Sequence, residues 1–469
     1  MGMIGTRLVP LLTVSLAGCA LFAPTAPYAP APLGGAADSM IRGRQPQEAA
    51  EPVRGPLTLH RCVEIALANN PDLEAGRRAV DVAQAERDVA AAQRWPSVRA
   101  RGSYEHHLDR QRLLPANRAQ QWGSYSKDLL EAGLVVHMPL YTGGQISYAI
   151  QGADLLRRAA EHRLAHTREE LVFNVASTAY AILAQRHVIE ALEFSRKALE
   201  EHRRRVEDLL AVQKAARVDL LRTEVRLADL QQKLVRERNV LAIQQRVLAN
   251  LLGVRLGDDG PAVEGQLDVA GTEPDAVQSL AKAYEARADY LAARAALEAQ
   301  AKRVDEARAG YAPTVSAAGY YGRRWAGQFI VPKTGGDDSG DLGHIGLEVE
   351  VPIFEGGRIA ARVRKERAAL AQARQALRKL ELQIRLEVET ALLNVTSTRE
   401  RVRATEKAIE QAEESLRIER EKYGLGRGSI TDVLDAQSAL LEAQTSYYGA
   451  LAEHNTAVAQ LRLATGTEP

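Results

Sequence analysis

The turn between the last two expected helices concentrates the residues whose chemistry could serve a function. Three glycines between positions 424 and 428 interrupt a long helical stretch, and the carboxylates of Asp432 and Asp435 follow. Ser429 lies three positions before Asp432, which is the spacing of a capping box that restarts a helix. Asp432 could therefore act only as a cap, and Asp435 could be an ordinary solvated charge. A functional acidic site at this turn is the other interpretation.

No catalytic arrangement stands out elsewhere in the chain. Glu105, His106 and His107 suggest a metal site. Neighbouring residues of a strand point to opposite faces, however, so the two histidines cannot chelate one ion from a single strand. A Gly-rich phosphate loop ending in Lys-Ser or Lys-Thr does not occur. We predict a protein that is not an enzyme, uses no metal or cofactor, and obtains energy from a partner.

The N-terminal residues have the pattern of an export signal. The apolar run Leu8–Leu16 is too short to span a bilayer, and small residues follow it. Leu-Ala-Gly-Cys at positions 16–19 resembles the box at which bacterial lipoproteins are cleaved and lipidated, so we predict a lipid on Cys19. Cleavage nearby with an incidental cysteine, or a disulfide to Cys62, is the alternative. Ala20 rather than Asp after the cysteine favours the outer membrane.

The composition favours long helices and excludes nucleic acid as a partner. Lys and Arg number 61 against 60 Asp and Glu, and no basic block occurs. Apolar residues make up 46% of the chain but aromatic residues only 5%, which suits helices packed through small side chains. Beyond the N-terminus there is no run of about 18 apolar residues, so we expect any membrane-spanning part to consist of strands.

The chain contains an internal repeat. Met138–Gly144 and Val351–Gly357 share the order Pro, aliphatic, aromatic, any residue, Gly, Gly, and a terminal glycine follows each motif 109 positions later, at Gly253 and Gly466. We expect a signal peptide (1–18), a lipidated linker (19–56), repeat 1 (57–253), a second linker (254–274), repeat 2 (275–466) and a tail (467–469). Each repeat is expected to hold one helix, two strands, a long helix and a further helix.

The expected strands alternate apolar and polar residues. They cover Val98–Tyr104, Leu134–Leu140, Val315–Tyr321 and Leu347–Ile353. A period of two gives each strand one apolar and one polar face. A sheet packed on a core has this pattern, and so does a transmembrane barrel with lipid outside and water inside. Alternation alone does not distinguish the two.

The helices are far too long for an ordinary globular domain. Residues 145–210 contain one glycine and no proline, and residues 358–423 contain neither. At 1.5 Å per residue, each stretch forms a helix of about 100 Å. A period of seven in the last helix predicts coiled-coil packing, with Ile430, Gln437, Gln444, Leu451 and Val458 along one seam.

Three motifs resemble the TolC-like outer-membrane efflux protein family. They are Asn70-Pro71-Asp72-Leu73, the paired Gly-Gly motifs, and the segment Tyr423–Gln437. The resemblance covers Leu57–Gly466, and the predicted lipid makes the chain most similar to the lipoprotein branch that serves resistance-nodulation-division pumps. It implies a mainly α fold in which each of three chains contributes four strands to a 12-stranded membrane β-barrel. The barrel would continue as a periplasmic α-barrel of coiled-coil helices, with residues 254–274 around its equator.

The resemblance also implies a function. The homotrimer would be the lipid-anchored outer-membrane exit duct of a tripartite efflux system, extending into the periplasm and passively conducting small molecules from an inner-membrane pump and a periplasmic adaptor. A periplasmic gate is implied at the Gly-rich turn. Asp432 and Asp435 would ring the aperture, while contacts among Tyr423, Arg427 and Asp219, which matches Asp432 in repeat 1, would hold it shut.

Two other functions remain open. The chain could be the exit duct of a type I secretion system, or a periplasmic coiled-coil adaptor or scaffold. An adaptor needs only one helical hairpin, whereas here the unit of hairpin and strands occurs twice. The sequence does not indicate the cargo or the identity of the pump.

Overall fold

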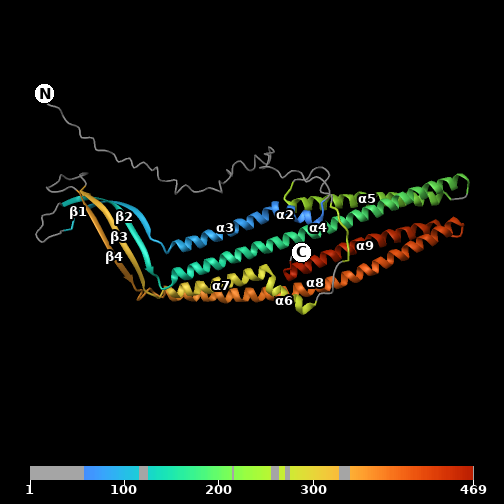
Figure 1. Ribbon diagram of the computed structural model, residues 1–469. Helices are drawn as coiled ribbons and strands as arrows, with labels where there is room; N and C mark the ends of the chain where they lie inside the picture. The colour runs from blue at the N-terminus through green and yellow to red at the C-terminus, as the bar shows by residue number, and fades with distance from the viewer. Residues whose placement is uncertain are drawn as a thin grey trace, which may run out of the picture. The chain divides into compact units, whose positions relative to one another are not determined.

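The computed structural model describes residues 57–115, 125–213, 216–254, 263–269, 275–326 and 339–467. Repeat 1 holds α2 (Leu59–Asn69), α3 (Pro71–Ala92), β1 (Ser97–Arg112), β2 (Tyr125–Tyr141), α4 (Gln145–Ala211) and α5 (Arg217–Leu252). Repeat 2 holds α6 (Ala276–Ala286), α7 (Ala288–Ala309), β3 (Thr314–Ala326), β4 (Ser339–Glu350), α8 (Arg358–Gly424) and α9 (Ile430–Thr465) (Figure 1). Both α4 and α8 have 67 residues, and both α5 and α9 have 36. The predicted tandem repeat of long helices and four strands is confirmed.

A pair of left-handed glycines forms each corner between sheet and long helix. Gly143 and Gly144 have φ of +62° and +90°, and Gly356 and Gly357 have +58° and +81°. Side chains disfavour this conformation, so two successive residues of this kind call for glycine. The Gly-Gly motifs of the two repeats are therefore the points where a strand direction changes into a helix axis.

The four strands form one antiparallel sheet in the order β1-β2-β3-β4. Val98 lies opposite Val136, Val136 opposite Gly319, and Gly319 opposite Ile345. Since side chains alternate along each strand, this register places the apolar sets of all four strands on one face. That face is open to solvent in the single chain: Ile345 is 92% exposed and Leu347 is 71% exposed.

The strand β4 ends earlier than expected. It ends at Glu350, so the segment Val351–Ile353, which we expected to continue the strand, lies outside it. Pro352 has no N–H to donate to a ladder, and β4 pairs only with β3 among the described strands. The edge position leaves this proline without a second neighbour that could hold it in the sheet.

The first helix of each repeat is broken, which corrects the expectation of a single helix. In repeat 1 the break has a cause in the local sequence, because Pro71 lacks an N–H and Asn70 caps the helix that follows. In repeat 2 the break falls at Arg287 without any proline. The Asn70 amide donates to the carbonyl of Leu251 at 3.0 Å, and the Arg287 guanidinium donates to the carbonyl of Ala464 at 3.3 Å. Each break is thus tied to the end of the last helix in its own repeat.

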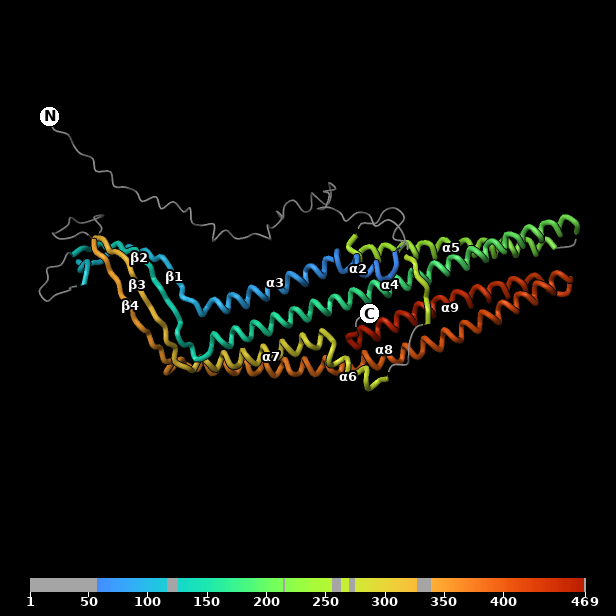
Figure 2. Tube along the Cα trace, in the orientation of Figure 1, coloured from blue at the N-terminus to red at the C-terminus, as the bar shows by residue number. Residues whose placement is uncertain are grey.

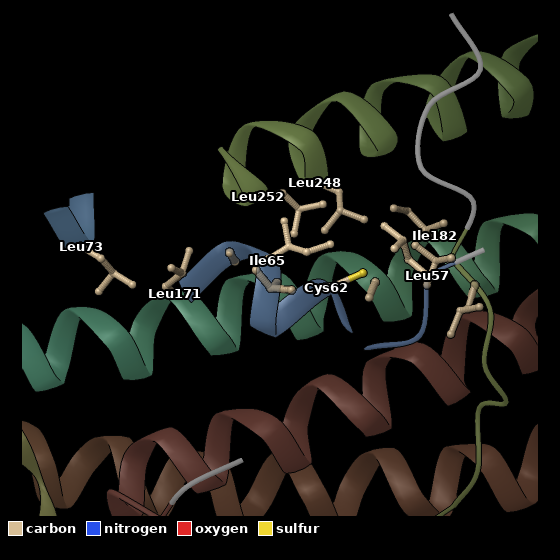
Figure 3. Close-up of a cluster of buried hydrophobic side chains, with 13 residues drawn as sticks. Leu57, Cys62, Ile65, Leu73, Leu171, Ile182, Leu248 and Leu252 are labelled. Atoms are coloured by element: carbon tan, nitrogen blue, oxygen red, sulfur yellow. The ribbon is translucent and has the colours of Figure 1, made fainter. Parts of the chain in front are cut away.

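A hydrophobic core forms where α2 packs between α4 and the end of α5 (Figure 3). Cys62, Ile182 and Leu248 are fully enclosed there. Val263, from the linker between the repeats, is buried in the same core and bridges to Leu57. Burial raises the pKa of the Cys62 thiol to about 11, so this thiol stays protonated at neutral pH. The described part of the linker is therefore packed structure, and its Leu267 also contacts the core of α8 and α9 in repeat 2.

Two long helical hairpins, α4–α5 and α8–α9, meet through α4 and α9 (Figure 2). Leu192 of α4 and Leu230 of α5 share one core with Leu434 of α9. The predicted seam of α9 is covered along its length: Ile430, Gln437 and Leu451 are buried, and Gln444 and Val458 are half-buried. Ile430 lies in the core shared by the hairpins, whereas Leu451 packs with Val402 of α8. None of the described helices has a stretch both long and apolar enough to cross a membrane.

Candidate functional site

The turn between α8 and α9 carries most of the predicted site residues. The helix α8 ends at Gly424, and Gly426 reverses the chain with a φ of +72°. The N–H of Thr431 donates to Oγ of Ser429 at 3.2 Å, and the N–H of Ser429 donates to Oδ2 of Asp432 at 3.2 Å. The predicted capping box is confirmed, so Asp432 does fix the start of α9.

The matching turn of repeat 1 is capped differently. Ala216 precedes α5 and offers no side chain to cap it. Asp219 lies in the first turn of α5 and is half-buried. A carboxylate at this place is favoured by the positive end of the helix dipole. Asp219 therefore stabilises a helix start, as its counterpart in repeat 2 does, but without the reciprocal bonds of a capping box.

Two polar contacts join the hairpins beside these turns. Nη1 of Arg222 donates to Oγ1 of Thr431 at 3.1 Å, and Nη2 of Arg226 donates to Oδ1 of Asp435 at 3.1 Å. Four residues separate the two members on each helix, so the contacts, which we call the cross-hairpin rungs, lie one helical turn apart. Asp435 thus takes part in an ion pair, although its side chain is 62% exposed.

Our sequence prediction missed both arginines of the cross-hairpin rungs. A signal for one of them exists in the repeat. Counting from the Gly-Gly motifs, Arg222 holds in repeat 1 the position that Asp435 holds in repeat 2. This equivalence would have pointed to the right region but to the wrong partner, because Arg222 donates to Thr431 and Asp435 pairs with Arg226. No comparable signal marks Arg226.

Tyr423 lies between the hairpins. It packs against their shared core, and its ring centre is 5.7 Å from that of His202 on α4. Burial raises the pKa of Tyr423, and the negative charge of Asp219 raises it further. The structure therefore brings Tyr423 and Asp219, which the resemblance links, into the same region, together with His202, which the sequence prediction did not include.

The remaining predicted residues are placed apart or lie outside the description. The Arg427 side chain is exposed, and its backbone N–H donates to the carbonyl of Lys422 at 2.9 Å. Within the described ranges, no hydrogen bond or ion pair involves the Arg427 guanidinium. Cys19, the predicted lipid site, lies outside the described residues.

The two histidines of β1 contact different carboxylates. Nδ1 of His106 is 2.7 Å from Oδ1 of Asp128, and Nε2 of His107 is 3.2 Å from Oε2 of Glu105. Across the described residues, no group of three or more potential ligands is arranged to hold a metal ion. Each histidine thus lies near a carboxylate of its own, and the two do not share one site.

Comparison with known proteins identifies the family. Residues 62–254 and 280–467 match the family described as outer membrane efflux protein. This chain belongs to that family. The two matched segments cover most of the described elements of both repeats, so the assignment rests on the whole architecture.

Individual relatives agree with this assignment. The outer membrane protein TolC of Vibrio cholerae is 22% identical over 351 residues, which cover 75% of this chain and 80% of TolC. The solved structure of the outer-membrane channel OprN covers 88% of this chain and 91% of its own, with 22% identity and a TM-score of 0.73. That of the outer membrane protein VceC from Vibrio cholerae covers 87% and 96%, with 21% identity and a TM-score of 0.71. The chain is an outer-membrane efflux channel protein, which confirms the predicted function and fold class.

Proposed function

We propose that three copies of this chain form the exit duct of a tripartite efflux system. An inner-membrane pump and a periplasmic adaptor deliver small molecules to the duct, which conducts them passively across the periplasm and the outer membrane. A lipid on Cys19 anchors each chain in the outer membrane. The observation that carries this proposal is the four-stranded sheet, with its continuous exposed apolar face and its two open edges.

The two faces of the sheet differ sharply in chemistry. One face exposes Leu134, Tyr321 and Ile345. On the other face, Arg324 donates to Glu131 at 2.8 Å. Exposing so large an apolar surface to water is unfavourable, whereas lipid on that face and a water-filled lumen on the other satisfy both sets of side chains.

The contacts within one chain favour a closed ring of copies. Among the helices next to the sheet, the packing order is α3-α4-α7-α8. Among the helices of the two hairpins, it is α5-α4-α9-α8. One side of the chain is thus formed by β1, α3 and α5, and the other by β4 and α8. These sides differ, so contacts between copies are head-to-tail, and such contacts give a ring when the rotation closes. Three copies supply the 12 strands that the family resemblance implies.

The proposed gate lies where the two hairpins end. The cross-hairpin rungs and the contact between Tyr423 and His202 hold the hairpins together. In a trimer, three copies of Asp432 and Asp435 would surround one aperture, and separation of the hairpins would widen it. Arg427, with its exposed side chain, is the member of the predicted gate that the contacts support least.

The duct is tested with the purified full chain in detergent. We expect a mass of three chains plus bound detergent by light scattering, and stepwise ion conductance after reconstitution into planar bilayers. A chain that stays monomeric and dissolves without detergent once Cys19→Ser has removed the lipid would point to an adaptor instead.

The lipid is tested separately from the duct. Cells given a labelled fatty acid should label the wild-type chain but not the Cys19→Ser variant. Equal labelling of both chains, or of neither, would refute the anchor at Cys19 and leave the proposed duct untouched.

A further inference from the structure

His202 is the histidine in the proposed contact between the hairpins. It lies on α4 and its ring faces that of Tyr423 on α8, with 57° between the planes. The Nε2 atom is buried, and no hydrogen-bond partner for it is present among the described residues. The Nε2 edge of the ring is therefore shielded from water, while the residue as a whole is half-buried.

The charges around His202 come from three helices. Arg205 lies on α4 itself, Arg420 lies with Tyr423 on α8, and Asp219 lies on α5. Burial has the largest effect and lowers the pKa of His202. The two guanidinium groups lower it further, whereas the carboxylate of Asp219 acts in the opposite direction. The net effect is that the packed arrangement disfavours the charged ring.

We propose that His202 makes the gate responsive to acid. The neutral ring packs against Tyr423 and helps to hold the hairpins together, whereas the protonated ring favours their separation. This inference rests on the proposed gate. A charged ring in this contact would be poorly solvated, would bury an N–H without an acceptor, and would face Arg205 and Arg420. When the hairpins separate, water reaches the ring and removes these costs.

The sign of the pH effect follows from proton linkage. His202 binds a proton more weakly in the packed state than in the separated state, where its pKa returns toward the ordinary value of 6.5. Protonation therefore stabilises the separated state. The shift begins as the pH falls through about 6.5 and is complete once the pH lies below the lowered pKa of the packed state.

The test is the conductance of the full-length trimer in planar bilayers, at a pH of about 7.5 and of about 5.5. We expect acid to raise the wild-type conductance about threefold or more, and to leave His202→Gln unchanged because that variant cannot take up the proton. His187→Gln is the matched control. His187 also lies on α4, and its ring stacks on Tyr448 of the other hairpin at 4.5 Å, so this variant should keep the acid response.

Each outcome of this test is decisive. A purely structural role for His202 would change the conductance of His202→Gln equally at both pH values and leave the acid response in place, which would overturn the proposal. A wild-type channel that conducts without any acid response would also overturn it. A wild-type chain that does not conduct at either pH would instead contradict the proposed duct itself.

Discussion

At the scale of single residues, the two repeats anchor the break in their first helix with different side chains. Asn70 anchors the first helix break of repeat 1 with a neutral amide. Arg287 anchors the equivalent break of repeat 2, is only 6% exposed, and forms ion pairs with Asp289 at 2.8 Å and Glu387 at 2.7 Å. A buried charge that loses its partner is costly, so the two anchors should respond differently to truncation.

Arg287→Ala should destabilise the protein by about 3–5 kcal/mol, because it leaves the carboxylate of Asp289 unpaired. Asn70→Ala should cost about 1–2 kcal/mol, since it removes a cap and one hydrogen bond. Denaturant-induced unfolding in detergent measures both. The exposed Arg78→Ala serves as the control with an effect near zero, and an Arg287→Ala variant as stable as this control would disprove the anchor.

The cost of Arg287→Ala should depend on pH. Burial raises the pKa of Asp289, but the hydrogen bonds and charge of Arg287 outweigh burial, so the net pKa is lowered. A carboxyl group whose pKa is lowered by folding stabilises the protein fully when the pH is above its unfolded-state pKa of about 3.9. This stabilisation is lost as the pH falls through the lowered pKa of the folded state. The stability gap between wild type and Arg287→Ala should therefore shrink below a pH of about 4 in unfolding curves, and a constant gap would argue against this ion pair.

Arg226→Ser should loosen the gate by removing the rung to Asp435. We expect single-channel conductance, or the fraction of time spent open, to rise about twofold or more, since each of three copies loses a link worth up to about 1 kcal/mol. Arg238→Ser is the matched control, because Arg238 binds Glu193 at 2.6 Å within one hairpin. Equal conductance of the two variants would show that the rung does not restrain the gate.

At the scale of elements, the C-terminal end of the last helix in each repeat packs against the break in the first helix of that repeat. Gly253 and Gly466 both have a φ of +66°. A Cβ added to Gly253 would lie 2.4 Å from the carbonyl oxygen of Asn69, and one added to Gly466 would lie 2.7 Å from the backbone nitrogen of Arg287. These glycines let two helix ends approach more closely than any side chain allows.

Gly466→Ala should therefore destabilise the protein by more than about 1 kcal/mol. Gly449 is the control within the same helix, because an added Cβ there meets nothing within 4 Å. Gly449→Ala should stabilise α9 by about 0.5–1 kcal/mol. Thermal dissociation of the trimer on gels compares the two variants, and a shift in the same direction for both would contradict the close approach.

At the scale of the whole molecule, the sheet faces should decide membrane insertion. Ile345 lies on the apolar face, and the adjacent His344 lies on the polar face. Ile345→Arg should cost about 2–4 kcal/mol if its side chain meets lipid near the middle of the bilayer, whereas His344→Arg should be tolerated in a wet lumen. The amount of trimer in isolated outer membranes measures this difference. Equal amounts would mean that lipid does not cover the apolar face.

The sequence by itself determined the features that depend on spacing along the chain. Repeat period, helix length, strand faces and the capping box of Ser429 and Asp432 all follow from short-range periodicity and turn chemistry, because these fix which side chains share a face. The sequence Asn70-Pro71 contains the local signal for a helix break, but we expected a single helix there. The gate roles of Tyr423, Arg427, Asp219, Asp432 and Asp435 stay predictions.

Only the tertiary structure decided which faces meet. The break at Arg287 has no local breaker, and its reason is the buried contact of the guanidinium with the carbonyl of Ala464. The cross-hairpin rungs join Arg222 to Thr431 across 209 positions, and His202 reaches Tyr423 from the other hairpin. Sequence spacing sets the pattern on each helix but not the rotation of one helix against another, because that rotation depends on the packing of many side chains at once.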